Sequence, residues 1–449
     1  MGGCHVKKFL ALLLAFGLFL TACSGSTKKE SPAAPATTAP ATSEPAKITV
    51  YARSGIYFNT LKAVAPAFTQ ETKVEVNVVE IGRDGYVDKV STELLGKSTG
   101  VDVVLILSNY MGQFGSGGQL EPLDPYFTKG LAPKDWAIAN FVPAAAKSVQ
   151  FKGKTYAVPM DVSTMFLFYR KDLIPNPPQT WDEYRDVAKQ FTKSSNPNSP
   201  TEFGSTFQGK RQETQPKEFY NYFWSMGGQI FDAKYVPTIN SEAGIKALTY
   251  IVDNYRTLKV YPPDITTYEF AEVQSAFQNG KTAMAVEWNP AYPNLIDKTK
   301  SPLVAEKFAI DLVPGVKGAD GKINRTPFMH TWTLAINSAS KQKEAAFKFI
   351  TWVTSKTHAK DYALSGGIPA VVAVLNDPEV QAKRPEFPMI LKSFQIAQVE
   401  PDVPEYPQVH LIISEAISIA LAGEKSPKDA LNQANAKIKQ LMEQRGYYK

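Results

Sequence analysis

Cysteine and histidine are scarce in this chain. Its 449 residues include two cysteines and four histidines. Cys4 and Cys23 both lie near the N-terminus, so no disulfide can cross-link the rest of the chain, whose stability must come from packing. The histidines lie far apart, without the His-x-x-x-His spacing of many zinc sites. The sequence therefore predicts neither a metal site nor another cofactor.

An excess of charge of one sign is also lacking. Charged residues make up 20% of the chain and leave a formal net charge of +6. This excess is too small and too scattered to indicate a nucleic-acid partner. The hydrophobic content of 44% is that of folded domains. Because one core rarely grows beyond roughly 250–300 residues, we expect two lobes or domains.

The apolar run near the N-terminus is short. It extends from Phe9 to Leu20, whereas a membrane span needs about 20 apolar residues. Lys7 and Lys8 precede the run, and the small residues Thr21 and Ala22 follow it. This order of charge, short apolar run and small residues is typical of an export signal.

The residues Leu20-Thr21-Ala22-Cys23 resemble the lipid-attachment box of bacterial lipoproteins. The resemblance implies that residues 1–22 are a signal peptide and that Cys23 carries the lipid. Residues 24–46 are rich in Pro, Ala and Thr and contain no large apolar residue, so residues 23–46 are expected to form a tether. We therefore place the folded body, from about Lys47, on the outer face of the cytoplasmic membrane.

Beyond Lys47, apolar residues alternate between the periods of strands and helices. Strand, helix, strand, helix and strand patterns occur in turn at residues 48–52, 61–68, 74–78, 87–94 and 101–107. This order predicts an α/β fold with an open parallel sheet. Ligands of such sheets bind beyond the carboxyl ends of the strands. The residues at those ends are Arg53-Ser54-Gly55 and Ser108-Asn109-Tyr110.

Later patterns predict further elements. Thr180 and Glu183 form a capping box at a helix start, and Gly423 separates two closing helices. We also expect a hairpin at residues 151–156, strands at 165–169, 282–287 and 331–336, and helices at 271–278 and from 343.

Two sequence motifs suggest enzymes but lack the required context. Gly96-Lys97-Ser98-Thr99-Gly100 fits a serine-hydrolase pattern, but here the helix precedes the serine and the strand follows it. Gly204 to Arg211 nearly matches a phosphate-binding loop, but Arg211 replaces the hydroxyl that would hold magnesium. Because sequence alone cannot place two carboxylates across a cleft, a carbohydrate-active enzyme stays open as an alternative.

Two tryptophans fall where predicted strands begin or end. Trp288 follows the strand at 282–287, and Trp332 lies at the start of the strand at 331–336. An aromatic ring at such a position can pack against the C–H face of a sugar while polar neighbours bind its hydroxyls. Core packing is the alternative for each ring.

From Lys47 onward the chain resembles family 1 extracellular solute-binding proteins, the receptors of ATP-binding-cassette sugar importers, and in particular maltose-binding members. The matching stretches are Val101–Val104, Gly118–Leu123, Gly153–Pro159, Tyr169–Pro178, Phe277–Met284, Pro327–Phe328 and Ala335–Asn337. The resemblance implies a two-lobed periplasmic-binding-protein-like fold that closes on its ligand without catalysis. It also implies a membrane permease as partner, and we expect a monomer.

The resemblance divides the body into two lobes with a ligand cleft between them. One lobe comprises residues 47–146 and 323–368, and the other comprises 147–322 and 369–449. The ligand contacts that we predict are Arg53, Asn109 and Tyr110 from the first lobe, Asp161, Glu218, Trp288 and Tyr292 from the second, and Trp332 and His410 near the crossing segments and the C-terminal helices.

Maltose is not implied as the ligand. Maltose-binding members carry Asn-Gly-Asp-Lys where this chain has Arg53-Ser54-Gly55-Ile56, and His-Asp-Arg where it has Ser108-Asn109-Tyr110. The resemblance therefore implies a receptor for a sugar or oligosaccharide of unspecified identity. A receptor for another solute is the nearer alternative. Iron is disfavoured, because the one Tyr-Tyr pair, Tyr447-Tyr448, lies at the extreme C-terminus.

Overall fold

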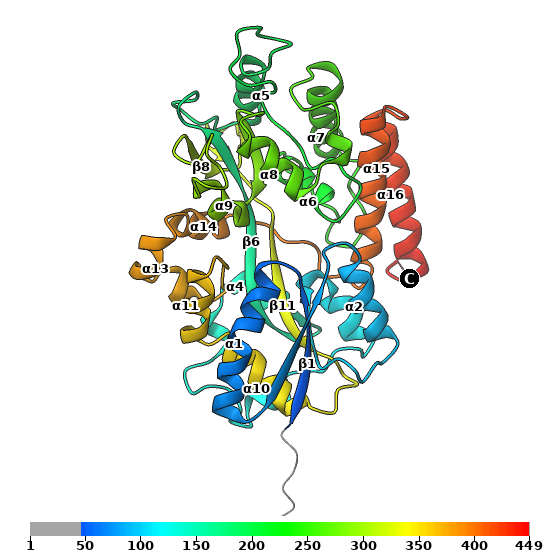
Figure 1. Ribbon diagram of the computed structural model, residues 1–449. Coiled ribbons are helices and arrows are strands. Elements are labelled where there is room, and N and C mark those ends of the chain that lie inside the picture. The colour runs from blue at the N-terminus through cyan, green and yellow to red at the C-terminus, as the bar shows by residue number, and fades with distance from the viewer. Residues whose placement is uncertain (1–45, 449) are drawn as a thin grey trace, which may run out of the picture. The chain divides into compact units, whose positions relative to one another are not determined.

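A mixed seven-stranded sheet organises residues 46–448, the part of the chain that the computed structural model describes (Figure 1). Its strand order is β2-β1-β3-β11-β6-β7, with β8 also paired to β6. The predicted signal peptide, Cys23 and all but the last residue of the tether lie outside the described residues. The strands of this sheet are β1 (Lys47–Arg53), β2 (Glu75–Ile81), β3 (Val103–Leu107), β6 (Ala157–Arg170), β7 (Met284–Trp288), β8 (Phe308–Leu312) and β11 (Met329–Ile336).

The first five elements confirm the predicted alternation of strand and helix. They are β1, α1 (Ile56–Thr72), β2, α2 (Tyr86–Leu95) and β3, and β1 pairs in parallel with both β2 and β3. All five residues of β3 are buried, as expected for a strand covered on both faces. Gly55, at φ 98°, allows the sharp turn from β1 into α1, because residues with a side chain rarely adopt this conformation.

Strand β6 is longer than its sequence pattern predicts. The prediction covered residues 165–169, whereas the strand begins at Ala157. Pro159 explains the difference, because proline disfavours strand interiors and is accommodated at bulges. It pairs with Thr333 of β11 where the register shifts. The first half of β6 pairs with β11, and the second half pairs with β7 and β8.

Helices cover both faces of the second half of β6. Phe166 and Phe168 point into one hydrophobic cluster, and Leu167 and Tyr169 point into the other. Figure 1 shows β6 running from the region of β1 and α1 to the region of β8 and α5. The remaining helices are α3 (Asp124–Phe127), α4 (Pro143–Ser148), α5 (Trp181–Gln190), α6 (Thr214–Ser225), α7 (Glu242–Val252), α8 (Phe270–Gln278), α9 (Tyr292–Ile296), α10 (Lys343–Val353), α11 (Lys356–Leu364), α12 (Val372–Leu375), α13 (Pro378–Lys383), α14 (Phe387–Phe394), α15 (Tyr406–Ala422) and α16 (Pro427–Gln444).

Local signals at helix and hairpin boundaries are confirmed. Thr180 Oγ1 accepts a hydrogen bond from the Glu183 amide at 3.2 Å, and the Glu183 carboxylate accepts one from the Thr180 amide at 3.3 Å. Gly423 ends α15 in the left-handed conformation. The hairpin is formed by β4 (Gln150–Phe151) and β5 (Lys154–Thr155), and a second short pair is formed by β9 (Val316–Lys317) and β10 (Ile323–Asn324).

Residues that follow position 368, where the chain was predicted to cross between the lobes, pack in the hydrophobic cluster that contains Phe166 and Phe168. Ala370, Leu375 and Phe387 share it with Val50 of β1. The lobe boundaries stay a prediction. Between residues 46 and 448, no helix combines the length and apolar character that crossing a membrane requires.

Candidate functional site

A cavity of about 220 Å³ lies beyond the end of β1, beside β6, β7 and β11. Residues of both predicted lobes line it. A second cavity, of about 210 Å³, shares Arg53, Arg83, Glu213 and Trp332 with it, and we call the two the inner and outer chambers. The inner chamber is lined by Arg53, Ser54, Gly55, Ile56, Tyr57, Arg83, Ser163, Glu213, Thr214, Phe270, Trp288, Pro290, Asn294, His330 and Trp332.

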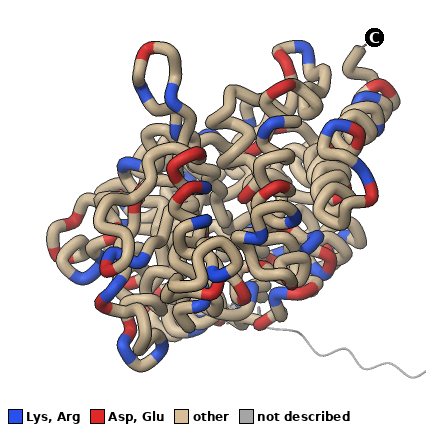
Figure 2. Tube along the Cα trace, turned by 90° about the horizontal axis from the view of Figure 1, so that it is seen from above, with Lys and Arg blue, Asp and Glu red and all other residues tan. Residues whose placement is uncertain are grey.

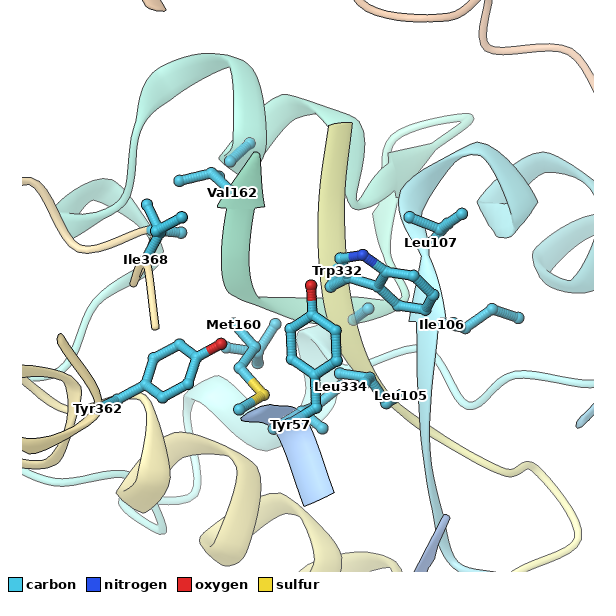
Figure 3. Packing of buried hydrophobic residues seen from close by; sticks show 14 of the residues in the cluster. Tyr57, Leu105, Ile106, Leu107, Met160, Val162, Trp332, Leu334, Tyr362 and Ile368 are labelled. Atoms are coloured by element: carbon cyan, nitrogen blue, oxygen red, sulfur yellow. The ribbon is translucent and has the colours of Figure 1, made fainter. Parts of the chain in front are cut away.

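Aromatic rings form much of the wall of the inner chamber. The Trp288 indole stacks on the His330 ring with centroids 4.4 Å apart, and its Nε1 donates a hydrogen bond to Gln208 Oε1 at 3.2 Å. The Trp332 ring lies 5.3 Å from the Tyr57 ring, and the two lie next to each other in Figure 3. These contacts fix both indole rings in the wall, where Trp288 is 3% exposed and Trp332 is 1% exposed.

Asp161 orders several of the neighbouring groups from behind the wall. Its carboxylate accepts hydrogen bonds from the Tyr57 hydroxyl at 3.3 Å, the Ser163 hydroxyl at 3.2 Å and the Tyr362 hydroxyl at 2.7 Å. The Ile368 amide donates another at 2.9 Å. Burial raises the pKa of Asp161 to about 6, although these hydrogen bonds act to lower it. Asp161 therefore positions Tyr57 and Ser163, which line the chamber.

A buried ion pair lies beside the aromatic wall. Lys217 is fully buried on α6, and its Nζ lies 2.5 Å from Glu213 Oε1 and 3.4 Å from His330 Nδ1. Burial would raise the pKa of Glu213, but the positive charges of Lys217 and Arg53 hold it at about 2. Burial, and then the charge of Lys217, lower the pKa of His330 well below its ordinary value. At neutral pH, Glu213 is ionised and His330 is neutral.

The structure brings three of the predicted contact residues into the inner chamber. Arg53 extends from the end of β1, with its guanidinium 4.9 Å from the Trp332 ring centroid. Trp288 ends β7, as predicted, and Trp332 lies on β11. Asp161 contributes indirectly, through the two groups that it orders.

The other five predicted residues do not line the inner chamber. Glu218 is buried beneath it and accepts a hydrogen bond from the Gln208 amide at 2.7 Å. Tyr110 stacks on Phe114, Tyr292 packs edge-on against Phe308, and His410 Nδ1 lies 3.9 Å from Glu400 Oε1. Asn109 lies next to Tyr110, and its buried Oδ1 has no hydrogen-bond partner among residues 46–448. Direct ligand contact by these five residues stays a prediction.

Comparison with known proteins places the chain in a family. The model of the family described as "Bacterial extracellular solute-binding protein" matches residues 52–360, more than half of the sequence. The chain is a bacterial extracellular solute-binding protein. This confirms the family predicted from the sequence. Because the family consists of receptors and not enzymes, the prediction that the cleft is non-catalytic is also confirmed.

Solved structures share the fold of this solute-binding protein. The T. maritima MalE3 protein with maltose bound is 28% identical, with a TM-score of 0.77 over 88% of this chain and 100% of the other. A solute-binding protein from Agrobacterium radiobacter K84 in complex with ribitol is 26% identical, with a TM-score of 0.79 over 89% and 99%. The predicted α/β periplasmic-binding-protein fold is therefore confirmed.

A curated relative of this solute-binding protein is named for a different class of solute. It is a probable amino-acid ABC transporter periplasmic-binding protein of Sinorhizobium fredii, 27% identical over 421 residues. The match covers 90% of this chain and 91% of the relative. The family is thus shown, whereas its members bind different solutes, and the residues of the chamber determine which ligand fits.

Several chamber residues of this solute-binding protein were missed from the sequence. Arg83 follows β2, so the rule that pointed to Arg53 at the end of β1 also applies to it. Ser163 lies in the part of β6 whose apolar run is interrupted, so its burial could not be recognised from the sequence. Tyr57 lies in the first turn of α1, four residues beyond Arg53, and could have been found by the same rule. Glu213 and Phe270 reach the chamber through contacts distant in sequence, and no local pattern marks them.

The described residues of this solute-binding protein form no metal centre. Between residues 46 and 448, no cluster of three or more His, Cys, Asp or Glu side chains could hold a metal ion. Lys and Arg are interspersed with Asp and Glu in Figure 2. The chamber can therefore bind a solute through aromatic stacking, hydrogen bonds and its own few charged groups.

Proposed function

We propose that this protein is the receptor of an ATP-binding-cassette importer for a small carbohydrate. The observation that carries the proposal is the pairing of aromatic faces, Trp288 and Trp332, with polar side chains such as Ser163 and Asn294 in one chamber. Sugars present both a C–H face and a rim of hydroxyls, and such a wall matches both. Maltose and ribitol in the two solved relatives support the same class of ligand.

The size of the inner chamber favours a ligand of one or two sugar units. Its volume of about 220 Å³ is below the roughly 300–1,000 Å³ that is usual for pockets of drug-sized ligands. The outer chamber provides room for a second unit or for exposed substituents. A long oligosaccharide would have to extend beyond both chambers.

Capture would involve closure of the two predicted lobes, 47–146 with 323–368 and 147–322 with 369–449. Arg53 and Trp332 would act from the first lobe, and Trp288 from the second. Contacts that form only in the closed state shift the open–closed equilibrium toward it. Asn109, Tyr110, Glu218, Tyr292 and His410 remain proposed as contacts or supports that closure would recruit.

Delivery to the permease would take place at the membrane surface. Residues 1–22 would be removed after export, and lipidated Cys23 would anchor the protein through the tether at 23–46. Stable anchoring takes more than one acyl chain, as in dual acylation. The protein would act as a monomer on the outer face of the cytoplasmic membrane.

A calorimetric and thermal-shift screen tests the ligand class. Mono- and disaccharides and sugar alcohols would be compared with amino acids at equal concentration. Ligand at 100 times its dissociation constant should stabilise the fold by about 2.7 kcal/mol. Binding of amino acids and of no carbohydrate would overturn the proposal in favour of the second candidate, an amino-acid receptor, which the name of the Sinorhizobium fredii relative supports.

The anchor has its own test. Cys23→Ala should leave the protein without lipid, so cell fractionation should find most of it released from the membrane. Cys4→Ala provides the matched control, because Cys4 would leave with the signal peptide. Equal membrane retention of the Cys23→Ala variant and the wild type would contradict the anchor.

A further inference from the structure

Two arginines in the chamber differ from every other arginine that the structure describes. Arg53 and Arg83 have no carboxylate oxygen within the 4.0 Å limit of an ion pair and no side-chain hydrogen bond within residues 46–448. Arg185 donates to Asn254 Oδ1, and Arg256 donates to backbone carbonyls. The others, which do lie that close to a carboxylate, are Arg170, Arg211, Arg325, Arg384 and Arg445.

The acids near these two arginines are engaged elsewhere or lie outside the inner chamber. Glu213 pairs with Lys217 at 2.5 Å. Glu269 precedes α8, where its backbone amide donates a hydrogen bond to Glu272 Oε2 at 2.9 Å, and with the exposed Asp84 and Asp88 it lines only the outer chamber. The inner chamber therefore contains two guanidinium groups and one carboxylate, that of Glu213, which forms its ion pair with Lys217 and with neither arginine.

Both guanidinium groups are held by aromatic rings. That of Arg53 lies 4.9 Å from the Trp332 centroid, and that of Arg83 lies 5.1 Å from the Phe270 centroid. Although Arg83 is exposed as a residue, burial of its guanidinium lowers its pKa, and the nearby charge of Arg53 lowers it further. An anion between the two would relieve this repulsion, because guanidinium groups bind carboxylates through paired hydrogen bonds.

We propose that the ligand is an acidic sugar, whose carboxylate binds between Arg53 and Arg83 while its ring packs on the tryptophans of the inner chamber. This inference rests on the proposed carbohydrate function and specifies its ligand class. A neutral sugar would fill the same chamber but leave both guanidinium groups without a partner. The arginines would thus select uronic and aldonic acids over the corresponding neutral sugars.

Matched ligand pairs test the proposal on the intact protein. Titration calorimetry would compare D-glucuronate with D-glucose, D-galacturonate with D-galactose and D-gluconate with D-glucitol. For at least one pair we expect the acid to bind about 10- to 100-fold more tightly, as charge-assisted hydrogen bonds imply. Raising the salt concentration should weaken binding of the acid and leave that of the neutral partner almost unchanged.

Variants assign the preference to the two arginines. Arg83→Ala and Arg53→Gln should each lose most of the preference for the acid, whereas Arg445→Ala, which removes an arginine outside both chambers, should retain it. Thermal unfolding would verify that each variant folds, and the salt dependence of the wild type does not rely on any variant. If a neutral sugar binds as tightly as its acid, or if both arginine variants keep the preference, this inference fails and the carbohydrate function stands. If no sugar of either kind binds, both fail.

Discussion

Two buried carboxyl groups lie behind the Trp288 ring. Glu287 Oε1 accepts a hydrogen bond from the Trp288 backbone amide at 2.6 Å. Glu218 Oε2 accepts one from the Gln208 backbone amide, and the Gln208 side chain accepts one from the Trp288 indole N–H. The second oxygen of each carboxyl group has no hydrogen-bond partner among the described residues. Burial raises the pKa of both groups well above the ordinary range, so the fold favours their neutral forms.

These raised pKa values predict that stability falls as the pH rises. In the unfolded chain the two carboxyls lose their protons near pH 4.3, whereas the folded protein retains them to a higher pH. Between the unfolded and the folded pKa of each carboxyl, the unfolded state binds fewer protons than the folded state. Each pH unit in that range therefore lowers the free energy of unfolding by about 1.4 kcal/mol per group. The lowered pKa values of His330 and His410 act in the opposite direction between pH 5 and about pH 6.5, so the contribution of the two carboxyls is measured as a difference between proteins. In urea unfolding at pH 5 and pH 8, the change in stability should be more unfavourable at the higher pH for the wild type than for the variant with both Glu218→Gln and Glu287→Gln.

The matched control is Glu242→Gln, which changes an exposed carboxylate at the start of α7. It should leave the difference between pH 5 and pH 8 unchanged. An equal loss of stability in the wild type and in the buried double variant would show that other groups cause the pH dependence.

Trp288 contributes both to ligand binding and to the core. Its side chain lines the chamber but is only 3% exposed, packed on His330 and Phe328. Trp288→Ala should remove about 1–3 kcal/mol of sugar binding, by analogy with aromatic stacking on bases, or roughly 5- to 150-fold in affinity. It should also lower the free energy of unfolding by up to about 3–5 kcal/mol. Calorimetry and urea unfolding measure the two effects.

Tyr292→Ala distinguishes between the two rings. Tyr292 packs on Phe308 and does not line the inner chamber, so its loss should weaken binding much less than the loss of Trp288, and only through a contact that it gains on closure. A folded Tyr292→Ala protein that no longer binds, beside a Trp288→Ala protein that binds normally, would identify Tyr292 as the stacking platform.

At the level of elements, a substitution in the capping box of α5 changes stability at a position outside both chambers. Thr180→Ala removes the acceptor of the Glu183 amide, so it should cost about 1 kcal/mol of stability. Affinity should not change, because Thr180 lines neither chamber. Thr180→Ser, which keeps the hydroxyl, should restore most of the loss in urea unfolding. A change in affinity without a change in stability would contradict this account.

Elements whose side chains follow one period could be predicted from the sequence. β1 to β3 and the helices between them show clear periods, and the Thr180 capping box is a local hydrogen-bond pattern. The first half of β6 was missed because Pro159 and polar residues such as Asp161 interrupt its apolar run. Pairing with β11, more than 150 residues later in the chain, and backbone hydrogen bonds with Ile368 and Ala370 stabilise that half as a strand.

Most of the candidate site that could be predicted coincides with strand ends, whereas Trp332, predicted at the start of a strand, lies within β11. Arg53 and Trp288 extend directly from the ends of β1 and β7, which a sequence pattern can locate. Glu213 precedes α6 and Phe270 begins α8, and both meet Arg53 and Arg83 only through the tertiary fold. His410, which the family resemblance suggested, lies in a buried setting near Glu400, where burial lowers its pKa to about 3, and its contact with the ligand stays a prediction.

At the scale of the whole body, the predicted boundaries place β11 in the first lobe and β6 in the second, so the pairing of these strands joins the two predicted lobes. Their pairing at Met329–Ala335 lies next to the chamber, where Ser163 of β6 and His330 of β11 are both part of the wall. A change in the angle between the lobes would therefore move Arg53 and Trp332 relative to Trp288. Ligand contacts to both sides at once would be strongest in one closed arrangement.

Closure predicts that the body becomes more compact when ligand binds. A sugar that touches Arg53 from one lobe and Trp288 from the other gains its full binding free energy only when both are within reach, so saturation should populate the closed state. Small-angle scattering should then give a smaller radius of gyration with the best sugar of the screen than without it. The Trp288→Ala variant should keep the larger radius at a sugar concentration at which calorimetry shows that it binds no sugar. An unchanged radius in the wild type at saturation would mean that the sugar enters a preformed site, and that β6 and β11 act as a rigid frame and not as a hinge.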